Sequence, residues 1–239
     1  DLSTFSKYEI RGADAHTFLE RVCANRIPVR DGGVMLGHLL TPAGFIESEI
    51  TVTRLAADHY YVLSAAVAQL HDLDQFEWRR QPGENFTVTD VTDEYGTLVL
   101  AGPRSREVLG AVTSCELSNA SFRWLTGKLA EVAGVAGVRL LRVNYVGELG
   151  WELHVPMARM PVVFDALMAA GAAHGIALFG TYAMNSLRME KAYRGWGSEL
   201  TNEVTMVEAD MERFVHYDKE FIGKAGTLHA RRLAAARLR

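Results

Sequence analysis

The sequence has few cysteines, no long apolar run and no leader-like opening, and each absence excludes a class of protein. Its two cysteines, Cys23 and Cys115, stand far apart and outside any metal-binding spacing, which excludes a disulfide-stapled scaffold and a zinc site. No apolar run approaches the roughly 18 residues that a membrane span needs, and the N-terminus has no signal-peptide pattern. We therefore expect a reducing, intracellular and cytoplasmic setting without a membrane partner.

The chain also lacks a basic excess and several well-known catalytic signatures. Its 29 acidic residues outnumber its 25 lysines and arginines, so the net charge is −4, whereas nucleic-acid-binding domains usually carry a basic surplus. Nucleic acid is therefore not an expected partner. There is no phosphate-cradling glycine loop, no GxSxG elbow and no His-x-x-x-His or Cys-x-x-Cys pair, so we expect no bound metal.

The composition is that of an ordinary globular protein, with 239 residues, 49% of them apolar and 23% charged. Alternating or β-rich segments predict strands at Ile46–Leu55, Tyr60–Leu63, Phe86–Val91, Thr97–Leu100 and Val138–Tyr145. Helical patterns cover Ala13–Ala24, Ala65–Arg80, Ser105–Val112, Val162–His174 and Tyr182–Arg194. Strands mixed with single helices, without regular βα alternation, indicate an α+β fold.

Local signals refine this outline. Within the second predicted helix, Val67, Leu70 and Leu73 fall at helical spacing and predict one apolar stripe. Pro161 suits the first turn of the fourth helix, and Gly175 suits its C-terminal cap. The chain opens directly into structured sequence without an initiator methionine, so we expect a piece of a longer polypeptide.

A first cluster of chemical interest runs from Gly44 to Val52. If this segment is a strand, Glu47 and Glu49 point to one face, while Ser48 points to the other. Two carboxylates on one face could hold a cationic amine or raise one another's pKa. The alternative is a solvated strand edge, which the spacing taken alone favours.

A second and a third cluster combine aromatic, acidic and glycine residues. The second, Asn144–His154, predicts a strand that enters a glycine-containing turn and leaves as another strand. A carboxylate beside aromatic rings suits a flat heterocycle with amidine-like N–H groups, because it accepts two parallel hydrogen bonds. Packing of a hairpin is the other explanation. In the third cluster, Asn185–Gly197, Asn185 and Arg188 share one helix face.

The order of these clusters, with Gly102–Leu109 between the first two, resembles the glycine-cleavage T-protein (aminomethyltransferase) superfamily. Three stretches resemble in particular the folate-binding domains of the dimethylglycine and sarcosine dehydrogenases: Asp1–Tyr8, Tyr145–Pro156 and Ala183–Val215. The resemblance implies a T-protein-like fold with mixed or antiparallel sheets and packed helices, without the C-terminal β-domain of its relatives. With Gly83 as a joint, we expect a first folate-domain segment over residues 1–82 and a second, α+β segment over 83–239.

The resemblance also implies a function and a set of site residues. Such proteins bind tetrahydrofolate and transfer a one-carbon unit from a methylated amine or iminium to it. By position in the motifs, Glu49 is the catalytic acid, Glu152 grips the pterin, Tyr145 lies alongside, and we assign Arg188 to cofactor binding as well. The expected partners are tetrahydrofolate and a small methylated donor. FAD is expected only if a missing N-terminal domain, or a separate oxidoreductase subunit, carries it, because this chain has no dinucleotide fingerprint.

The sequence departs from the family pattern at several positions. Glu49 replaces the usual aspartate, which moves the charge by roughly 1 Å, and misplacement on that scale can lower a rate on the order of 100-fold. Phe45 replaces the second glycine of the same motif, and Met184 replaces an arginine that helps to bind folate in the plain T-proteins. Met206 and Asp210 stand where relatives often have proline and glycine.

Two other functions stay open. The altered acid at Glu49 suits a folate-dependent demethylase of a sulfonium or methoxy donor, which would form 5-methyl-tetrahydrofolate. A non-catalytic folate-binding or assembly protein is the other alternative. Its known relatives carry a Lys-Gly-Cys signature, which this sequence lacks.

Overall fold

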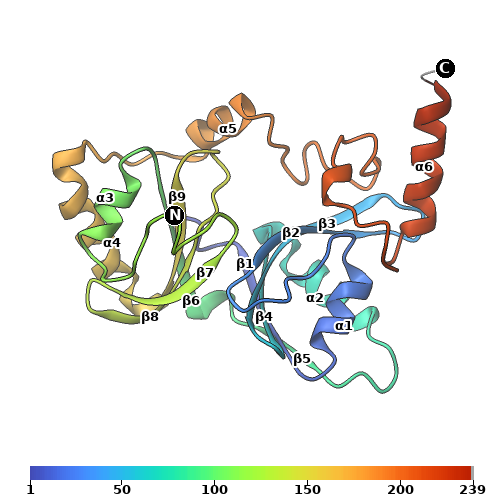
Figure 1. Cartoon of the computed structure of the whole chain (residues 1–239), viewed down its shortest axis with the longest axis horizontal. Coiled ribbons are helices and arrows are strands. Elements are labelled where there is room, and N and C mark those ends of the chain that lie inside the picture. The colour runs from blue at the N-terminus through green and yellow to red at the C-terminus, as the bar shows by residue number, and fades with distance from the viewer. Residues whose placement is uncertain (238–239) are drawn as a thin grey trace. The chain divides into compact units, whose positions relative to one another are not determined.

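A computed structural model describes residues 1–237 and shows strands and helices in an α+β arrangement (Figure 1). Among these residues, no helix has both the length and the apolarity needed to cross a membrane. The chain folds into two compact units: unit 1 comprises residues 1–4 and 92–194, and unit 2 comprises residues 5–91 and 195–239. The units therefore alternate along the chain, whereas the expected segments, 1–82 and 83–239, are each continuous.

Unit 2 is built on a five-stranded sheet whose strands are ordered β2-β3-β4-β1-β5, with every neighbouring pair antiparallel. The strands are β1 (Ser6–Arg11), β2 (Val34–Leu40), β3 (Ile46–Ala56), β4 (His59–Ser64) and β5 (Thr87–Asp90). Along β3, buried and half-buried residues alternate from Ile46 to Val52, so the two faces of the sheet have different surroundings.

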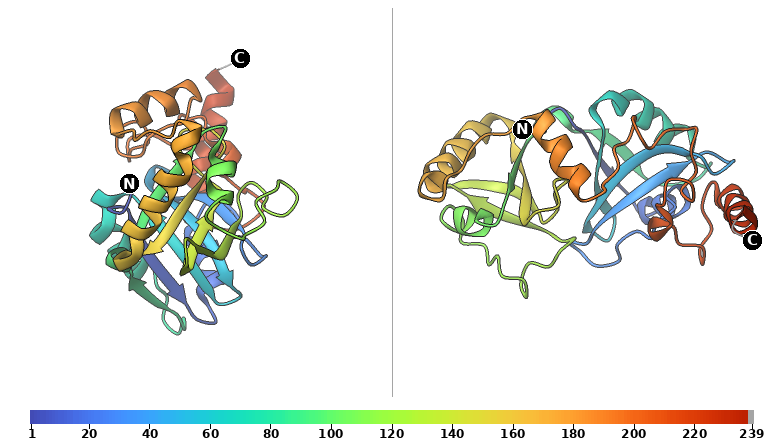
Figure 2. Two further views of the ribbon diagram at one scale, coloured as in Figure 1. Left: turned by 90° about the vertical axis from the view of Figure 1, so that its left-hand side faces the viewer. Right: turned by 90° about the horizontal axis from the view of Figure 1, so that it is seen from above.

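Helices α1 (Ala15–Val22) and α2 (Gln69–Trp78) cover one face of this sheet, as Figure 2 shows. A short 3₁₀ turn, η1 (Ala66–Ala68), precedes α2. The apolar residues of α1 recur at helical spacing and form one buried stripe. With Phe76 of α2 they pack against strand residues such as Ile50 and Val52. Burial of these apolar side chains of α1 and α2 against the sheet holds both helices in place.

The C-terminal part of unit 2 consists of loops, a 3₁₀ turn η5 (Glu212–Phe214) and helix α6 (Lys224–Arg237). Its buried apolar side chains form a separate cluster with Leu40 and Ile46, at the ends of β2 and β3. Gly44, in the β2–β3 turn, has a φ of +89° and lies against the backbone of Gly226, so a larger side chain would not fit there.

Unit 1 contains an antiparallel four-stranded sheet ordered β6-β9-β8-β7. Its strands are β6 (Tyr95–Ala101), β7 (Gly127–Val132), β8 (Val135–Leu141) and β9 (Gly150–Pro156), and its helices are α3 (Ser105–Gly110), α4 (Met160–Gly171) and α5 (Thr181–Glu190). Short 3₁₀ turns are η2 (Thr92–Glu94), η3 (Met157–Arg159) and η4 (Ala172–His174). Buried Trp151 and Leu153 of β9 pack with α3 and α4 on one face of the sheet.

All five predicted helices are present, each shorter than expected, and the cap prediction for α4 holds. Pro161 lies in its first turn, and Gly175 ends the following η4 turn with a φ of +70°. Of the apolar stripe predicted for the second helix, Leu73 packs against the core, but the prediction is wrong for Val67 and Leu70. Val67 is 90% exposed and Leu70 is 74% exposed, because this helix buries Phe76 instead.

Strands β1, β2 and β7 had no counterpart in the sequence prediction. β2 is mostly apolar and buried on nearly every residue, so it lacks the alternation by which a half-buried strand is recognised. β1 does alternate, with Tyr8 and Ile10 between polar residues, but it is only six residues long and was not recognised. The predicted strand Val138–Tyr145 ends earlier than expected, at Leu141, so Tyr145 lies in the loop between β8 and β9.

Candidate functional site

Glu49 lies in β3, on the face of the unit 2 sheet opposite α1 and α2. Its neighbour Ile50 is buried in the core with these helices, and successive strand residues alternate between faces. The Oε2 atom of Glu49 is 3.1 Å from Nε2 of His38, the residue directly opposite on β2. The side chain is 20% exposed, and within residues 1–237 its other oxygen, Oε1, makes no hydrogen bond. Glu49 therefore keeps one oxygen for a ligand.

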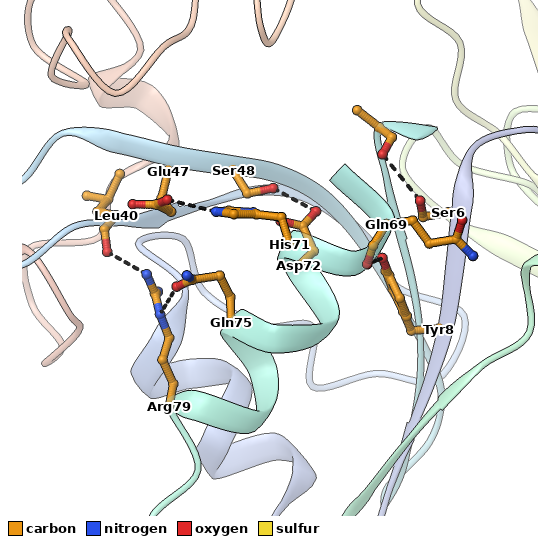
Figure 3. A network of polar contacts seen from close by, with 11 residues as sticks. Ser6, Tyr8, Leu40, Glu47, Ser48, Gln69, His71, Asp72, Gln75 and Arg79 are labelled. Atoms are coloured by element: carbon orange, nitrogen blue, oxygen red, sulfur yellow. Dashed lines mark hydrogen bonds and ion pairs between the residues drawn. The ribbon is translucent and has the colours of Figure 1, made fainter. Parts of the chain in front are cut away.

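Glu47 has a different partner from Glu49, although simple alternation placed the two together. A β-bulge interrupts the β2–β3 register beside Glu47, and a bulge redirects side chains. The Glu47 carboxylate contacts Nε2 of His71 at 2.9 Å, and Nδ1 of His71 is 3.0 Å from buried Asp72 (Figure 3). The two carboxylates are therefore held by separate histidines.

The same network holds β3 against α2. The hydroxyl of Ser48 donates a hydrogen bond to Oδ2 of Asp72 at 2.9 Å, as Figure 3 shows. Burial lowers the pKa of His71, but hydrogen bonds to Asp72 and Glu47 outweigh burial, so its pKa lies above the ordinary value. Because Ser48 and Glu47 are both fixed to α2, the backbone that carries Glu49 has little freedom.

Glu152 lies in β9 of unit 1, on the sheet face opposite α3 and α4. Trp151 and Leu153 on either side of it are buried in the core, so alternation places Glu152 and His154 together on the other face. Nε2 of His154 is 3.4 Å from Oε2 of Glu152, and Nδ1 of His154 is 3.1 Å from the hydroxyl of Thr97. The Glu152 carboxylate makes no hydrogen bond and no other ion pair in the part of the chain that the structure describes.

Tyr145 lines a pocket of about 540 Å³ that lies entirely within unit 1. The pocket is bounded by the end of β6, by α3, by α4 and by the segment 174–181, and Met184 also lines it. The loop that carries Tyr145 is closed by Asn144, whose side-chain amide bonds the backbone of Glu148 in both directions. The volume suits a small heterocyclic ligand. Neither Glu152 nor Arg188 lines this pocket, so the structure brings together Tyr145 and Met184 but not all the predicted residues.

Arg188 is buried near the end of α5, where it joins the helix to the following loop. Its Nε donates to Oδ1 of Asn185 at 2.8 Å, as the shared helix face predicted, and its Nη1 donates to the carbonyl of Tyr193 at 2.8 Å. Through these hydrogen bonds Arg188 holds the end of α5 against the loop that follows it. Its predicted role in cofactor binding stays a prediction.

His38 and His154 were missed by the sequence analysis, which gave scattered histidines no role. His154 carries a usable signal, because it stands two residues from Glu152 on a predicted strand and must share its face. His38 is the one ionisable residue of the apolar run Val34–Leu40, but its partner depends on the β2–β3 register. That register is set by the turn that joins β2 to β3 and by the register shift between Leu39 and Leu40, and neither was predicted from the sequence.

Thiol and metal chemistry find little support in the geometry. Burial raises the pKa of the Cys23 thiol to about 11, so a thiolate nucleophile is disfavoured there. Across residues 1–237, no three histidine, cysteine or acidic side chains are grouped in a way that could hold a metal ion. The groups that remain for chemistry are the two acids, Glu49 and Glu152, and the pocket beside Tyr145.

Comparisons with known proteins agree with this fold. Residues 1–219 match the family described as "GCVT N-terminal domain". Among curated proteins, the chain is 40% identical over 227 residues to dimethylglycine dehydrogenase of Homo sapiens, covering 94% of this chain and 26% of that protein. It is 34% identical over 226 residues to sarcosine dehydrogenase of Homo sapiens, covering 88% of this chain and 24% of that protein. The chain thus spans about a quarter of the length of these relatives.

A solved structure supports the fold independently of close sequence similarity. The glycine cleavage system aminomethyltransferase T from Bartonella henselae superposes with a TM-score of 0.85 at 22% identity, covering 97% of this chain and 62% of that one. The α+β fold with antiparallel sheets and packed helices, expected from the sequence, is therefore confirmed.

Proposed function

The chain belongs to the GCVT N-terminal domain family, and from that membership we propose that it binds tetrahydrofolate and accepts a one-carbon unit from a methylated amine or iminium onto it. One observation carries the proposal. The two acids at the family's motif positions, Glu49 and Glu152, both lie on the sheet face opposite the packed helices, and both have an oxygen without a hydrogen-bond partner among residues 1–237.

Glu152 is proposed as the group that holds the pterin. A pterin presents an amidine-like edge with two parallel N–H donors, and a carboxylate can accept both. The nearest cation-forming group, Nε2 of His154, is 3.4 Å from Oε2, which is longer than a normal hydrogen bond. Both oxygens of Glu152 are therefore available to a ligand. Tyr145, which lies in the loop between β8 and β9, is proposed as an aromatic contact.

Glu49 is proposed to act on the reacting nitrogen atoms. In the transfer, the iminium carbon forms bonds to N5 and N10 of tetrahydrofolate and the donor C–N bond breaks. The two hydrogens of N5 and N10 leave with the donor, which departs as a protonated amine. A fixed carboxylate oxygen beside that carbon stabilises the cationic donor electrostatically and can relay one of these protons.

Oxidation of an amine to an iminium requires a further component. No dinucleotide fingerprint occurs in this sequence, so we propose that FAD, where it takes part, is held by another domain or by a separate subunit. The name of one relative, heterotetrameric sarcosine oxidase, describes a protein of several subunits. The cytoplasmic setting also stays a prediction, since several of the similar dehydrogenases are mitochondrial.

A folate-dependent demethylase is the alternative function, because the resemblance described from the sequence implies that Glu49 replaces an aspartate. That reaction would move a methyl group from a sulfonium or methoxy donor and form 5-methyl-tetrahydrofolate. Transfer from an iminium would form 5,10-methylene-tetrahydrofolate instead. The folate product therefore separates the two reactions.

The test supplies the chain with tetrahydrofolate and with the iminium that a separate FAD-dependent oxidase forms from dimethylglycine. We expect 5,10-methylene-tetrahydrofolate to form faster than in a reaction without the chain, with one equivalent of sarcosine released. Formation of 5-methyl-tetrahydrofolate from a methoxy or sulfonium donor would favour the demethylase. Tetrahydrofolate binding without turnover of either donor would contradict a transferase and favour a binding protein.

A further inference from the structure

Three consecutive residues of β3 are each tied to a different partner side chain. Glu47 contacts His71 and Ser48 contacts Asp72, both on α2, while Glu49 contacts His38 on β2. The first two contacts fix the strand to the helix (Figure 3). The third acts only on the Glu49 side chain, at the position where the chemistry is proposed.

His38 is unusual among the histidines of unit 2 because it is fully buried. Its Nε2 faces Glu49, and its Nδ1 is buried without a hydrogen-bond partner in the described part of the chain. The ring of Phe214 lies beside it, with centroids 5.9 Å apart. A proton on Nδ1 would be a buried donor without an acceptor, which is costly. The site therefore favours the tautomer with its proton on Nε2, directed at Glu49.

A glutamate needs such a partner more than an aspartate does. Its side chain has one more rotatable bond than that of aspartate, so its carboxylate can occupy more positions. The cross-strand pairing of Glu49 with His38 places the two side chains on the same sheet face at adjacent positions. The Nε2–H group can then fix Oε2 and leave Oε1 directed away from β2.

We propose that His38 is a positioning residue for Glu49, whose Nε2–H donor holds Oε2 and leaves Oε1 as the oxygen that faces the reacting folate nitrogen. This inference rests on the proposed function of Glu49. It explains how a glutamate can present one oxygen in a fixed position, because the histidine removes the freedom that its extra methylene introduces relative to aspartate.

The first test replaces His38 by two amides that differ in reach. In His38→Gln the amide nitrogen can take the place of Nε2, whereas in His38→Asn the amide is too short. At saturating tetrahydrofolate, we expect His38→Asn to lower the methylene-transfer rate about 10- to 100-fold, because a displacement of about 1 Å costs up to that much. His38→Gln should stay within about threefold of wild type, and tetrahydrofolate affinity should change less than twofold in both. His16→Asn, at another histidine of unit 2 whose ring bonds the Tyr60 hydroxyl, is the matched control.

A double substitution tests whether the effect passes through Glu49. In Glu49→Asp the shorter carboxylate loses its contact with His38, so adding His38→Asn should lower the rate no further. Additive losses would overturn the proposal, as would equal losses in His38→Asn and His38→Gln in proteins of unchanged melting temperature. Wild-type rates in His38→Asn would overturn it as well.

A spectroscopic measurement separates this proposal from the proposed function. In protein labelled with ¹⁵N-histidine, we expect the His38 ring to show a protonated Nε2 and a bare Nδ1, with the Nε2 signal shifting in Glu49→Gln. If the wild-type chain transfers no one-carbon unit, the proposed function fails while this signal still reports the pair. If the Nε2 signal of His38 is the same in Glu49→Gln as in the wild type, the positioning proposal fails, whether or not the chain transfers one-carbon units.

Discussion

The two sheets each present one acid beside one fully buried histidine, yet the two pairs differ in geometry. In unit 2, Glu49 and His38 face each other across neighbouring strands at 3.1 Å. In unit 1, Glu152 and His154 stand two residues apart on one strand, and their nearest atoms are 3.4 Å apart. The second nitrogen of His154 meets the Thr97 hydroxyl, whereas the second nitrogen of His38 has no partner within residues 1–237.

The different geometry of the two acid–histidine pairs suits the two acids to different tasks. A cross-strand histidine within hydrogen-bond distance holds one carboxylate oxygen and leaves a single oxygen free, which suits an acid that acts at one atom. A same-strand histidine that is itself held by Thr97 leaves both oxygens of Glu152 available, which suits recognition of two parallel donors. The different geometries therefore support the proposal that Glu49 takes part in the chemistry and Glu152 in binding.

The largest expected effect tests whether the two regions are separate cores. Trp151 is fully buried in unit 1 beside Phe122, and removing a buried aromatic side chain costs about 3–5 kcal/mol of unfolding free energy. We expect Trp151→Ala to lose about that much in urea unfolding, with the ¹⁵N signal of His154 lost at lower urea than that of His38. Phe76→Ala, in the core of unit 2, should reverse the order. Simultaneous loss of both signals in each variant would contradict the division.

The next effect separates chemistry from binding. Glu49→Gln keeps the shape of the side chain but removes its charge and its ability to take a proton. We expect the methylene-transfer rate at saturating tetrahydrofolate to fall about 100- to 1,000-fold, while the dissociation constant changes less than about twofold. Steady-state kinetics and titration calorimetry on the same preparation measure the two quantities. A large loss of affinity with an unchanged rate would place Glu49 in the binding site instead.

A smaller effect is expected from removal of the hydroxyl group that contacts His154 in unit 1. Thr97→Val removes the hydroxyl that meets His154 and leaves a buried ring nitrogen without that partner. Loss of one such hydrogen bond is worth about 1 kcal/mol, so we expect tetrahydrofolate affinity to fall about fivefold. Thr53→Val is the matched control, because its buried hydroxyl has no hydrogen-bond partner in the described chain. Equal tetrahydrofolate affinities in Thr97→Val and Thr53→Val would show that the Thr97 hydroxyl does not affect binding.

The smallest effect is a pH dependence that belongs to unit 2 alone. The pKa of His71 is raised in the folded protein, so its stabilisation is fully present below the unfolded value of about 6.5 and is lost as pH rises through the folded value. We expect the unfolding free energy to decline over that window, and His71→Gln to flatten the decline. Glu47→Gln, which removes one of the two carboxylates, should remove only part of it. An unchanged slope in His71→Gln would show that another group is responsible.

Much of the fold follows from local pattern, and the failures have physical causes. Helices α1 to α5 and the alternating strand β3 were predicted because a one-sided burial leaves a period in the sequence. β2 escaped prediction because it is mostly apolar and buried on nearly every residue, so its sequence does not alternate. The prediction that Val67 and Leu70 are buried was wrong because spacing shows which residues share a helix face, but not which face packs against the core.

The candidate site was predictable only in part. The resemblance to the T-protein superfamily supplied Glu49 and Glu152, and alternation gave each its sheet face. The sequence analysis did not place a bulge beside Glu47, nor His38 opposite Glu49, since both depend on the register of β3 with β2, a strand that was not predicted. Tyr145 was expected on a strand beside Glu152, but it lies in a loop and lines a pocket that Glu152 does not line.

The measurement that tests the central claim most directly is calorimetric titration of tetrahydrofolate into the chain, with Glu152→Ala in parallel. The account predicts binding in the micromolar range, weakened tenfold or more by the substitution, which corresponds to about 1.4 kcal/mol or more. An affinity that Glu152→Ala leaves unchanged would contradict the assignment of Glu152 and the comparison built on it.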